Sequence, residues 1–167
     1  VGRPVNFKVE KSAPKTGRPV LEVRNLCVMN AKKVLGVKNF SLTVHAGEIV
    51  GLAGVDGNGQ TELVEAVCGL LPAESGSVII DGTDATDLTV RRRNELGLGH
   101  IPEDRIKRGL IASMRIAGNM VMKSYYQRPF SRNGILNFPE INTNSEAVVR
   151  KFDVRSGEGI NSPAGKL

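Results

Sequence analysis

The stretch Gly54-Val55-Asp56-Gly57-Asn58-Gly59-Gln60-Thr61 decides the fold of this chain. Its glycines have the spacing of a phosphate-binding loop (P-loop), in which backbone N–H groups surround an anion at the start of a helix. The residues before it, 48–53, are mostly apolar and predict a short buried strand. The residues after it, 61–71, carry leucine and valine at helical spacing and predict a helix. Strand, glycine loop and helix together are the context that such a loop requires.

Gln60 stands at the position where this loop ordinarily carries lysine. A glutamine amide donates neutral hydrogen bonds, whereas a lysine brings a full positive charge to the phosphates. Asp56 and Glu62 add carboxylates that repel an anion unless Mg²⁺ or a basic neighbour screens them. Thr61 keeps the hydroxyl that holds Mg²⁺ in such loops. We expect nucleotide binding to be weakened and hydrolysis to suffer more. The alternative interpretation is a connector that only turns a strand into a helix.

The phosphate-binding residues predicted from this motif lie in and just after the loop. They are Gly54, Asp56, Gly57, Asn58, Gly59, Gln60, Thr61 and Glu62.

The composition permits an anionic partner without identifying one. The chain has 167 residues and a formal net charge of +6, but only 4% aromatic residues and no Trp. The stacking platforms of single-stranded nucleic-acid binders are therefore poorly supplied, and we expect no specific nucleic-acid partner. The run Arg91–Arg93 is interpreted as a solvated helix face. No stretch approaches the roughly 18 apolar residues that a membrane span needs, so we expect a cytosolic chain able to dock on a membrane protein.

Hydrophobic periodicity and turn residues predict the remaining elements. We predict further strands at residues 20–26, 37–44, 77–81 and 98–101. We predict helices that start after a cap at Asp87 or Thr89 and run to about Leu96, and at 116–122 and 145–152. Residues 125–134 are predicted to be a loop with exposed aromatic and basic side chains.

From residue 19 onward the chain resembles the ATP-binding cassette (ABC) domain of bacterial importers. The runs Val20-Leu-Glu-Val-Arg-Asn-Leu26, 37–54 and 65–82 are similar to the opening strands, P-loop approach, first helix and following strand of that family. Within the family, Asp56-Gly-Asn-Gly-Gln-Thr-Glu62 and Ile101-Pro-Glu-Asp-Arg105 resemble the second cassette of tandem subunits that serve simple-sugar and nucleoside importers.

The resemblance implies an α/β fold: a P-loop NTPase core of ABC type with an antiparallel β layer and a partial helical subdomain. The domain boundaries that it implies are a linker at 1–18, the core at 19–112, the partial helical subdomain at 113–160 and a tail at 161–167. It also implies ATP and Mg²⁺ as cofactors. The expected partners are membrane-spanning permease subunits and another cassette domain, which would place the chain at the inner face of the cell membrane.

Glu103 stands where the family has a glutamine that contacts Mg²⁺. The resemblance therefore implies Thr61 and Glu103 as the metal ligands. The alternative is that Glu103 only pairs with Arg105 or Arg108 at the surface. Residues 28–34 offer no aromatic side chain to stack on adenine, so base recognition is weak, apolar or supplied elsewhere.

The family's Ser-Gly-Gly signature and its strand ending in Asp-Glu do not occur in this sequence. We therefore interpret the chain as the front portion of a cassette, name no catalytic residue, and expect no appreciable ATP hydrolysis by this chain alone. The parent subunit would be an ATPase. A degenerate, non-hydrolysing nucleotide-binding or structural module is the competing interpretation, and a nucleic-acid binder is a third. The loop 125–134 is the expected permease contact.

Overall fold

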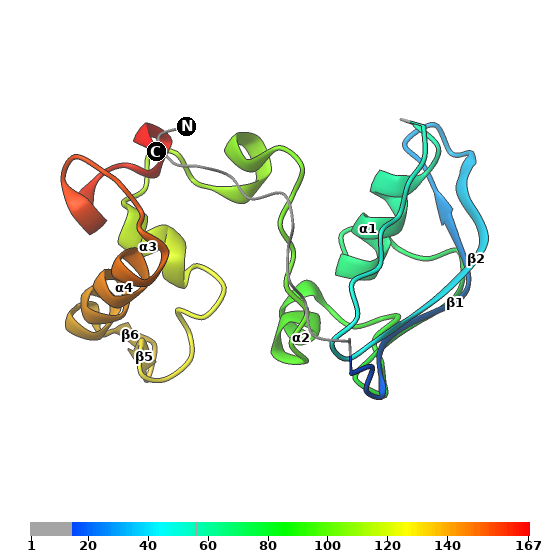
Figure 1. The fold of residues 1–167 in the computed structure, drawn as a ribbon, viewed down its shortest axis with the longest axis horizontal. Coiled ribbons are helices and arrows are strands. Elements are labelled where there is room, and N and C mark those ends of the chain that lie inside the picture. Colours follow the sequence, from blue (N-terminus) through cyan, green and yellow to red (C-terminus); the bar gives the residue numbers. More distant parts are fainter. Residues whose placement is uncertain (1–14, 56) are drawn as a thin grey trace. The chain divides into compact units, whose positions relative to one another are not determined.

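The computed structural model describes residues 15–55 and 57–167 (Figure 1). The chain divides after Leu98 into two compact units. The domain boundaries predicted at residues 18, 112 and 160 stay predictions. Most of the predicted linker, residues 1–14, lies outside the described residues, but Gly17 already donates a hydrogen bond to the carbonyl oxygen of Ala46 (2.9 Å).

An antiparallel sheet forms the first unit's β layer. It contains β1 (Pro19–Met29), β2 (Leu35–His45), β3 (Ser75–Ile80) and β4 (Thr83–Asp84), in the order β2-β1-β3-β4. The strands predicted at 20–26, 37–44 and 77–81 are therefore confirmed. The alternation in β1 slips near Asn25, whose positive φ of 50° marks a register shift between Val23 and Leu26. This shift brings both of these side chains into the core.

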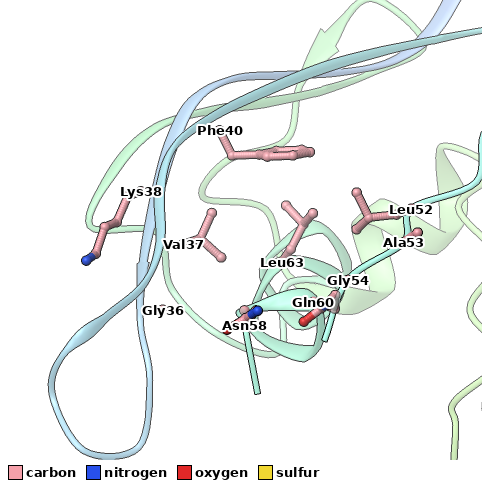
Figure 2. A pocket seen from close by; sticks show the side chains of 11 residues that line it. Gly36, Val37, Lys38, Phe40, Leu52, Ala53, Gly54, Asn58, Gln60 and Leu63 are labelled. Carbon is pink, nitrogen blue, oxygen red and sulfur yellow. The ribbon is translucent and has the colours of Figure 1, made fainter. Parts of the chain in front are cut away.

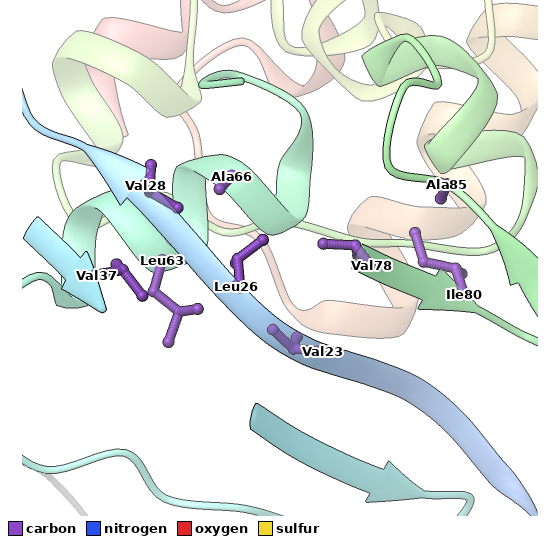
Figure 3. Close-up of a cluster of buried hydrophobic side chains, with 9 residues drawn as sticks. All are labelled: Val23, Leu26, Val28, Val37, Leu63, Ala66, Val78, Ile80 and Ala85. Atoms are coloured by element: carbon purple, nitrogen blue, oxygen red, sulfur yellow. The ribbon is translucent and has the colours of Figure 1, made fainter. Parts of the chain in front are cut away.

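Helix α1 (Gln60–Cys68) covers one face of the sheet and completes the core of this unit. Leu63 and Ala66 face the buried side chains of the strands, among them Leu26 (Figure 3). The helix ends three residues earlier than predicted because Gly69 adopts a left-handed conformation (φ 77°) and its N–H donates to the carbonyl oxygen of Ala66.

Two predicted strands do not form. The segment 48–53 is irregular and belongs to no sheet, and its Ile49 is 90% exposed instead of buried. The segment 98–101 is also irregular, and Ile101 is 93% exposed. A strand is stable only beside a hydrogen-bonding neighbour. In the part of the chain that the structure describes, neither segment has one.

The second unit consists mainly of helices and turns. Its elements are η1 (Arg105–Gly109), α3 (Ile116–Val121), β5 (Ser131–Arg132), β6 (Ile135–Leu136), α4 (Phe138–Phe152), η2 (Gly159–Asn161) and η3 (Ala164–Lys166). The core joins α3, α4 and η2 through Ala117, Val121, Ile141 and Ile160.

Helix α4 is longer than the predicted helix at 145–152. It begins at Phe138 because Asn137 caps it, with its side-chain oxygen accepting from the N–H of Glu140 (3.5 Å). The predicted helix at 116–122 is confirmed as α3, and the predicted loop at 125–134 contains the short strand β5. No helix in the described ranges has the length and apolar character needed to cross a bilayer.

Candidate functional site

The glycine loop makes a tight turn before α1. Gly57 and Gly59 have positive φ angles of 83° and 96°, which glycine adopts without steric cost. The N–H of Asn58 donates to the carbonyl oxygen of Val55 (3.2 Å), which closes the turn. Asp56, a predicted phosphate-binding residue, lies outside the described residues. The remaining predicted loop residues are contiguous with the start of α1, as the motif requires.

Gly59 also allows the loop to approach strand β2. A Cβ at this position would collide with the carbonyl oxygen of Gly36, so the two backbones are in direct contact here. Gly59 is the N-cap of α1, and among the described residues no side chain caps this helix. The N–H groups of its first turn therefore keep their hydrogen-bonding capacity for an anion, which the helix dipole also favours.

Gln60 folds back onto its own loop. Its amide nitrogen Nε2 donates to the carbonyl oxygen of Val55 (3.1 Å), and a Cβ on Gly54 would overlap this nitrogen. A glutamine amide has two N–H donors, so the second remains for a ligand. Gln60 thus occupies the position of the motif's lysine as a neutral donor held by the loop backbone.

Thr61 and Glu62 start the helix in different surroundings. Thr61 is exposed, so its hydroxyl is accessible to a metal ion bound with a phosphate. Glu62 is half-buried, and its side-chain carbons pack beside Gly36 at the start of β2. Its packing directs the side chain toward the β1–β2 hairpin.

The predicted metal ligand Glu103 lies in the second unit and is exposed. Its neighbour Asp104 is the carboxylate with a structural role here, because it accepts from the N–H groups of Ile106 (3.1 Å) and Lys107 (3.0 Å). Thr61 and Glu103 belong to different units, so their joint binding of Mg²⁺ stays a prediction.

An open pocket of about 360 Å³ lies beside the loop (Figure 2). Val37, Phe40 and Leu63 form apolar walls, and Gln60 and Asn58 supply polar groups. Lys38 also lines the pocket, but Figure 2 shows its ammonium group pointing away from the loop. The described pocket lining therefore offers backbone and amide donors to an anion without a cation directed at the loop.

Arg93 contradicts the interpretation of Arg91–Arg93 as a solvated helix face. Arg93 lies in α2 (Val90–Glu95) and is only 3% exposed. Of the two predicted caps of this helix, Asp87 and Thr89, the structure has Thr89. The Arg93 guanidinium donates to the carbonyl oxygens of Ala66 (2.6 Å), Val67 (2.7 Å), Thr86 (2.7 Å) and Leu88 (3.0 Å). Burial lowers the pKa of the Arg93 guanidinium.

This arginine anchors the C-terminal end of the helix whose N-terminal end carries the glycine loop. Sequence reasoning missed it because three successive arginines are alike in type. The only signal was its position three residues before Leu96, an apolar residue that packs toward the same core.

Comparison with known proteins gives a consistent result. A family model described as "ABC transporter" matches residues 37–158. The chain is 44% identical over 156 residues to the guanosine import ATP-binding protein NupO of Bacillus subtilis, which covers 93% of this chain and 31% of that protein. It is 43% identical over 163 residues to the nucleoside import ATP-binding protein NupA of Lactococcus lactis, which covers 97% of this chain and 32% of that protein.

A more distant relative is the glucose import ATP-binding protein TsgD13 of Haloferax volcanii, 36% identical over 168 residues, with 100% of this chain and 30% of that protein covered. The chain thus spans about a third of the length of these relatives.

Solved structures show the same fold at low sequence identity. A nucleotide-free ATP-binding cassette from an ABC transporter superposes with a TM-score of 0.67 at 15% identity, covering 89% of this chain and 59% of that one. The cassette MJ0796, in a dimeric post-hydrolysis state bound to ADP and Pi, gives 0.68 at 17% identity, with 88% and 62% covered. The predicted α/β P-loop NTPase fold of cassette type is therefore confirmed.

Proposed function

The chain belongs to the ABC transporter family, and from this premise we propose that it is the ATP-binding region of an importer subunit for nucleosides or simple sugars. The observation that carries the proposal is the glycine cradle, which consists of residues 57–59 and the first turn of α1. No side chain of the described residues caps this turn. The import proteins from Bacillus and Lactococcus support the nucleoside branch, because they are 44% and 43% identical to this chain, compared with 36% for the glucose import protein.

The residues of the cradle fit a nucleotide with Mg²⁺. Gly57 and Gly59 have no side chain to obstruct phosphate oxygens, and the first-turn N–H groups of α1 donate to them. The Thr61 hydroxyl would hold Mg²⁺, and Glu103 is the second ligand that we propose. Mg²⁺, when bound, neutralises part of the phosphate charge. Gln60 donates one amide N–H to a phosphate while the other holds Val55.

The surrounding partners follow from the same proposal. Permease subunits and a second cassette would bind the chain at the inner face of the cell membrane, where nucleotide binding changes the conformation of the assembly. The loop 125–134 is the proposed permease contact, since Tyr125 and Arg128 are exposed there. Unchanged assembly and uptake in a transporter carrying Tyr125→Ala and Arg128→Ala would remove this contact from the proposal.

A non-hydrolysing nucleotide-binding module is the second candidate function. It is favoured by the neutral Gln60 amide and by its hydrogen bond to Val55, which satisfies part of the donor capacity that a phosphate would use. The structure weakens the case for nucleic-acid binding, which relied on the run Arg91–Arg93. Arg93 is buried, and Arg92 forms an ion pair with Glu95 (2.8 Å).

Calorimetric titration with MgATP and MgADP tests the proposal, with Gln60→Lys measured beside the unaltered chain. We expect saturable binding that lysine tightens by about tenfold, because a charge-assisted hydrogen bond replaces a neutral one. Binding without ATP hydrolysis in a complete transporter would favour the second candidate. Absence of binding by both proteins would refute the nucleotide site.

A further inference from the structure

The cradle needs positive charge that its own residues do not supply. Gln60 is neutral, Glu62 is a carboxylate in the first turn of α1, and Lys38 points away from the loop (Figure 2). We propose that Lys32 and Lys33, at the tip of the β1–β2 hairpin, provide this charge to the phosphates of a bound nucleotide. The inference rests on the proposed nucleotide site and adds two residues to it.

The hairpin tip has a defined conformation. The side-chain oxygen of Asn30 accepts from the backbone N–H groups of Lys32 (2.9 Å) and Val34 (3.1 Å). The backbone N–H of Asn30 donates to the carbonyl oxygen of Val34 (2.9 Å), which closes the turn. Lys33 has a positive φ of 57° within this turn. The backbone of the two lysines is therefore fixed by local hydrogen bonds, while their side chains remain long and flexible.

The hairpin packs directly against the phosphate cradle. The carbonyl oxygen of Gly36, just beyond the turn, fills the space where a Cβ of Gly59 would stand. Glu62 and Asn30 both lie close to Gly36. A Cβ added to Gly36 would stand 3.3 Å from Glu62 Cγ and 3.5 Å from Asn30 Cβ. The C-terminal end of the turn thus adjoins the glycine loop and the first turn of α1 through Gly36, which also lines the pocket. Lys32 and Lys33 lie only four and three residues before Gly36 in the chain, and their long side chains start from this turn.

The two lysines have charge available for a ligand. Both are exposed, and no carboxylate in residues 15–55 or 57–167 forms an ion pair with either of them. Glu62 packs beside Gly36 of this hairpin, and it forms no ion pair with either lysine in the described structure. A phosphate group, with its greater charge, would attract the lysines more strongly than one carboxylate does.

Nucleotide titration of the double variant Lys32→Gln, Lys33→Gln tests this role. We expect MgATP to bind roughly 5- to 30-fold more weakly, as two solvent-exposed charge contacts are lost. The loss should shrink at high salt because screening already weakens such contacts. Lys15→Gln is the matched control, because Lys15 is exposed in the same unit and its backbone carbonyl lies beside Gly47, past the end of β2 opposite the hairpin tip. Its affinity for MgATP should change less than about twofold. Adenosine, which lacks phosphates, should bind both proteins equally.

Two further outcomes separate the possible failures. Equal MgATP affinity of the double variant and the unaltered chain, or an equal loss with Lys15→Gln, overturns the lysine role and leaves the proposed function standing. Absence of MgATP binding by the unaltered chain refutes the proposed function together with this inference. Circular dichroism of every variant checks that the fold is retained. In a Gln60→Lys background the double variant should lose less MgATP affinity, since the cradle then has its own cation.

Discussion

Replacing Arg93 with methionine should destabilise the first unit more than any surface substitution in α2. The guanidinium is buried and all of its hydrogen-bond acceptors are backbone carbonyl oxygens. Two of these, on Ala66 and Val67, lie in the last turn of α1, where the regular helical hydrogen bonds end, although the Ala66 oxygen also accepts from the N–H of Gly69. Methionine fills a similar space but donates no hydrogen bond, so each of the carbonyls would lose the guanidinium as a hydrogen-bond donor.

The magnitude follows from opposing contributions. Each hydrogen bond from a charged donor is worth about 1.5–3 kcal/mol, and the arginine makes several of them. Removing the guanidinium also returns several kcal/mol that its burial costs. The net loss in free energy of unfolding should be about 3 kcal/mol. Arg93→Lys keeps the charge without the planar array of donors, and we expect about half of that loss.

Urea unfolding followed by circular dichroism measures this loss. Arg92→Met is the matched control, because Arg92 is the preceding residue of the same helix and pairs with Glu95 on the surface. Its effect should stay within about 0.5 kcal/mol. The reasoning is refuted if Arg93→Met unfolds at the same urea concentration as Arg92→Met with an unchanged slope, since the buried hydrogen bonds would then contribute nothing measurable.

Three other perturbations test separate parts of the molecule. Gly59→Ala should abolish MgATP binding and destabilise the chain by more than about 1 kcal/mol, because the alanine Cβ would collide with the Gly36 carbonyl at a position with positive φ. Calorimetry measures the binding and urea unfolding measures the stability. An unaltered MgATP affinity would contradict the cradle geometry. The hydrogen bond from the His45 backbone N–H lowers the pKa of Glu48, so this carboxylate stabilises the fold above its unfolded pKa of about 4.3 and loses that effect as pH falls through its lower folded value. Glu48→Gln should flatten the acid limb of stability against pH in urea titrations, and an unchanged limb would count against this. Asn119→Ala should loosen the segment 111–115, because the Asn119 side chain accepts from the N–H of Ile111 (2.8 Å) and donates to nearby carbonyls. Faster amide exchange in this segment is expected, and unchanged exchange would be the contrary result.

The local elements of the fold followed from sequence because their causes are local. Alternation in β1 and β2 and the glycines before α1 specify strand and turn within a few residues. Helix α4 shows where such reasoning was incomplete. Its first half has little apolar periodicity, and its start depends on the cap at Asn137, a residue that the predicted boundary did not include.

The sequence by itself determined the glycine cradle, the neutral Gln60 at its centre and the family membership that the comparisons confirm. Tertiary structure alone decided that Arg93 is buried and that the segment 48–53 stays outside the sheet. The physical reason is the range of the interactions. A turn or a helix start is specified by neighbouring residues, whereas burial of a charge and pairing of a strand depend on partners that folding brings from elsewhere in the chain.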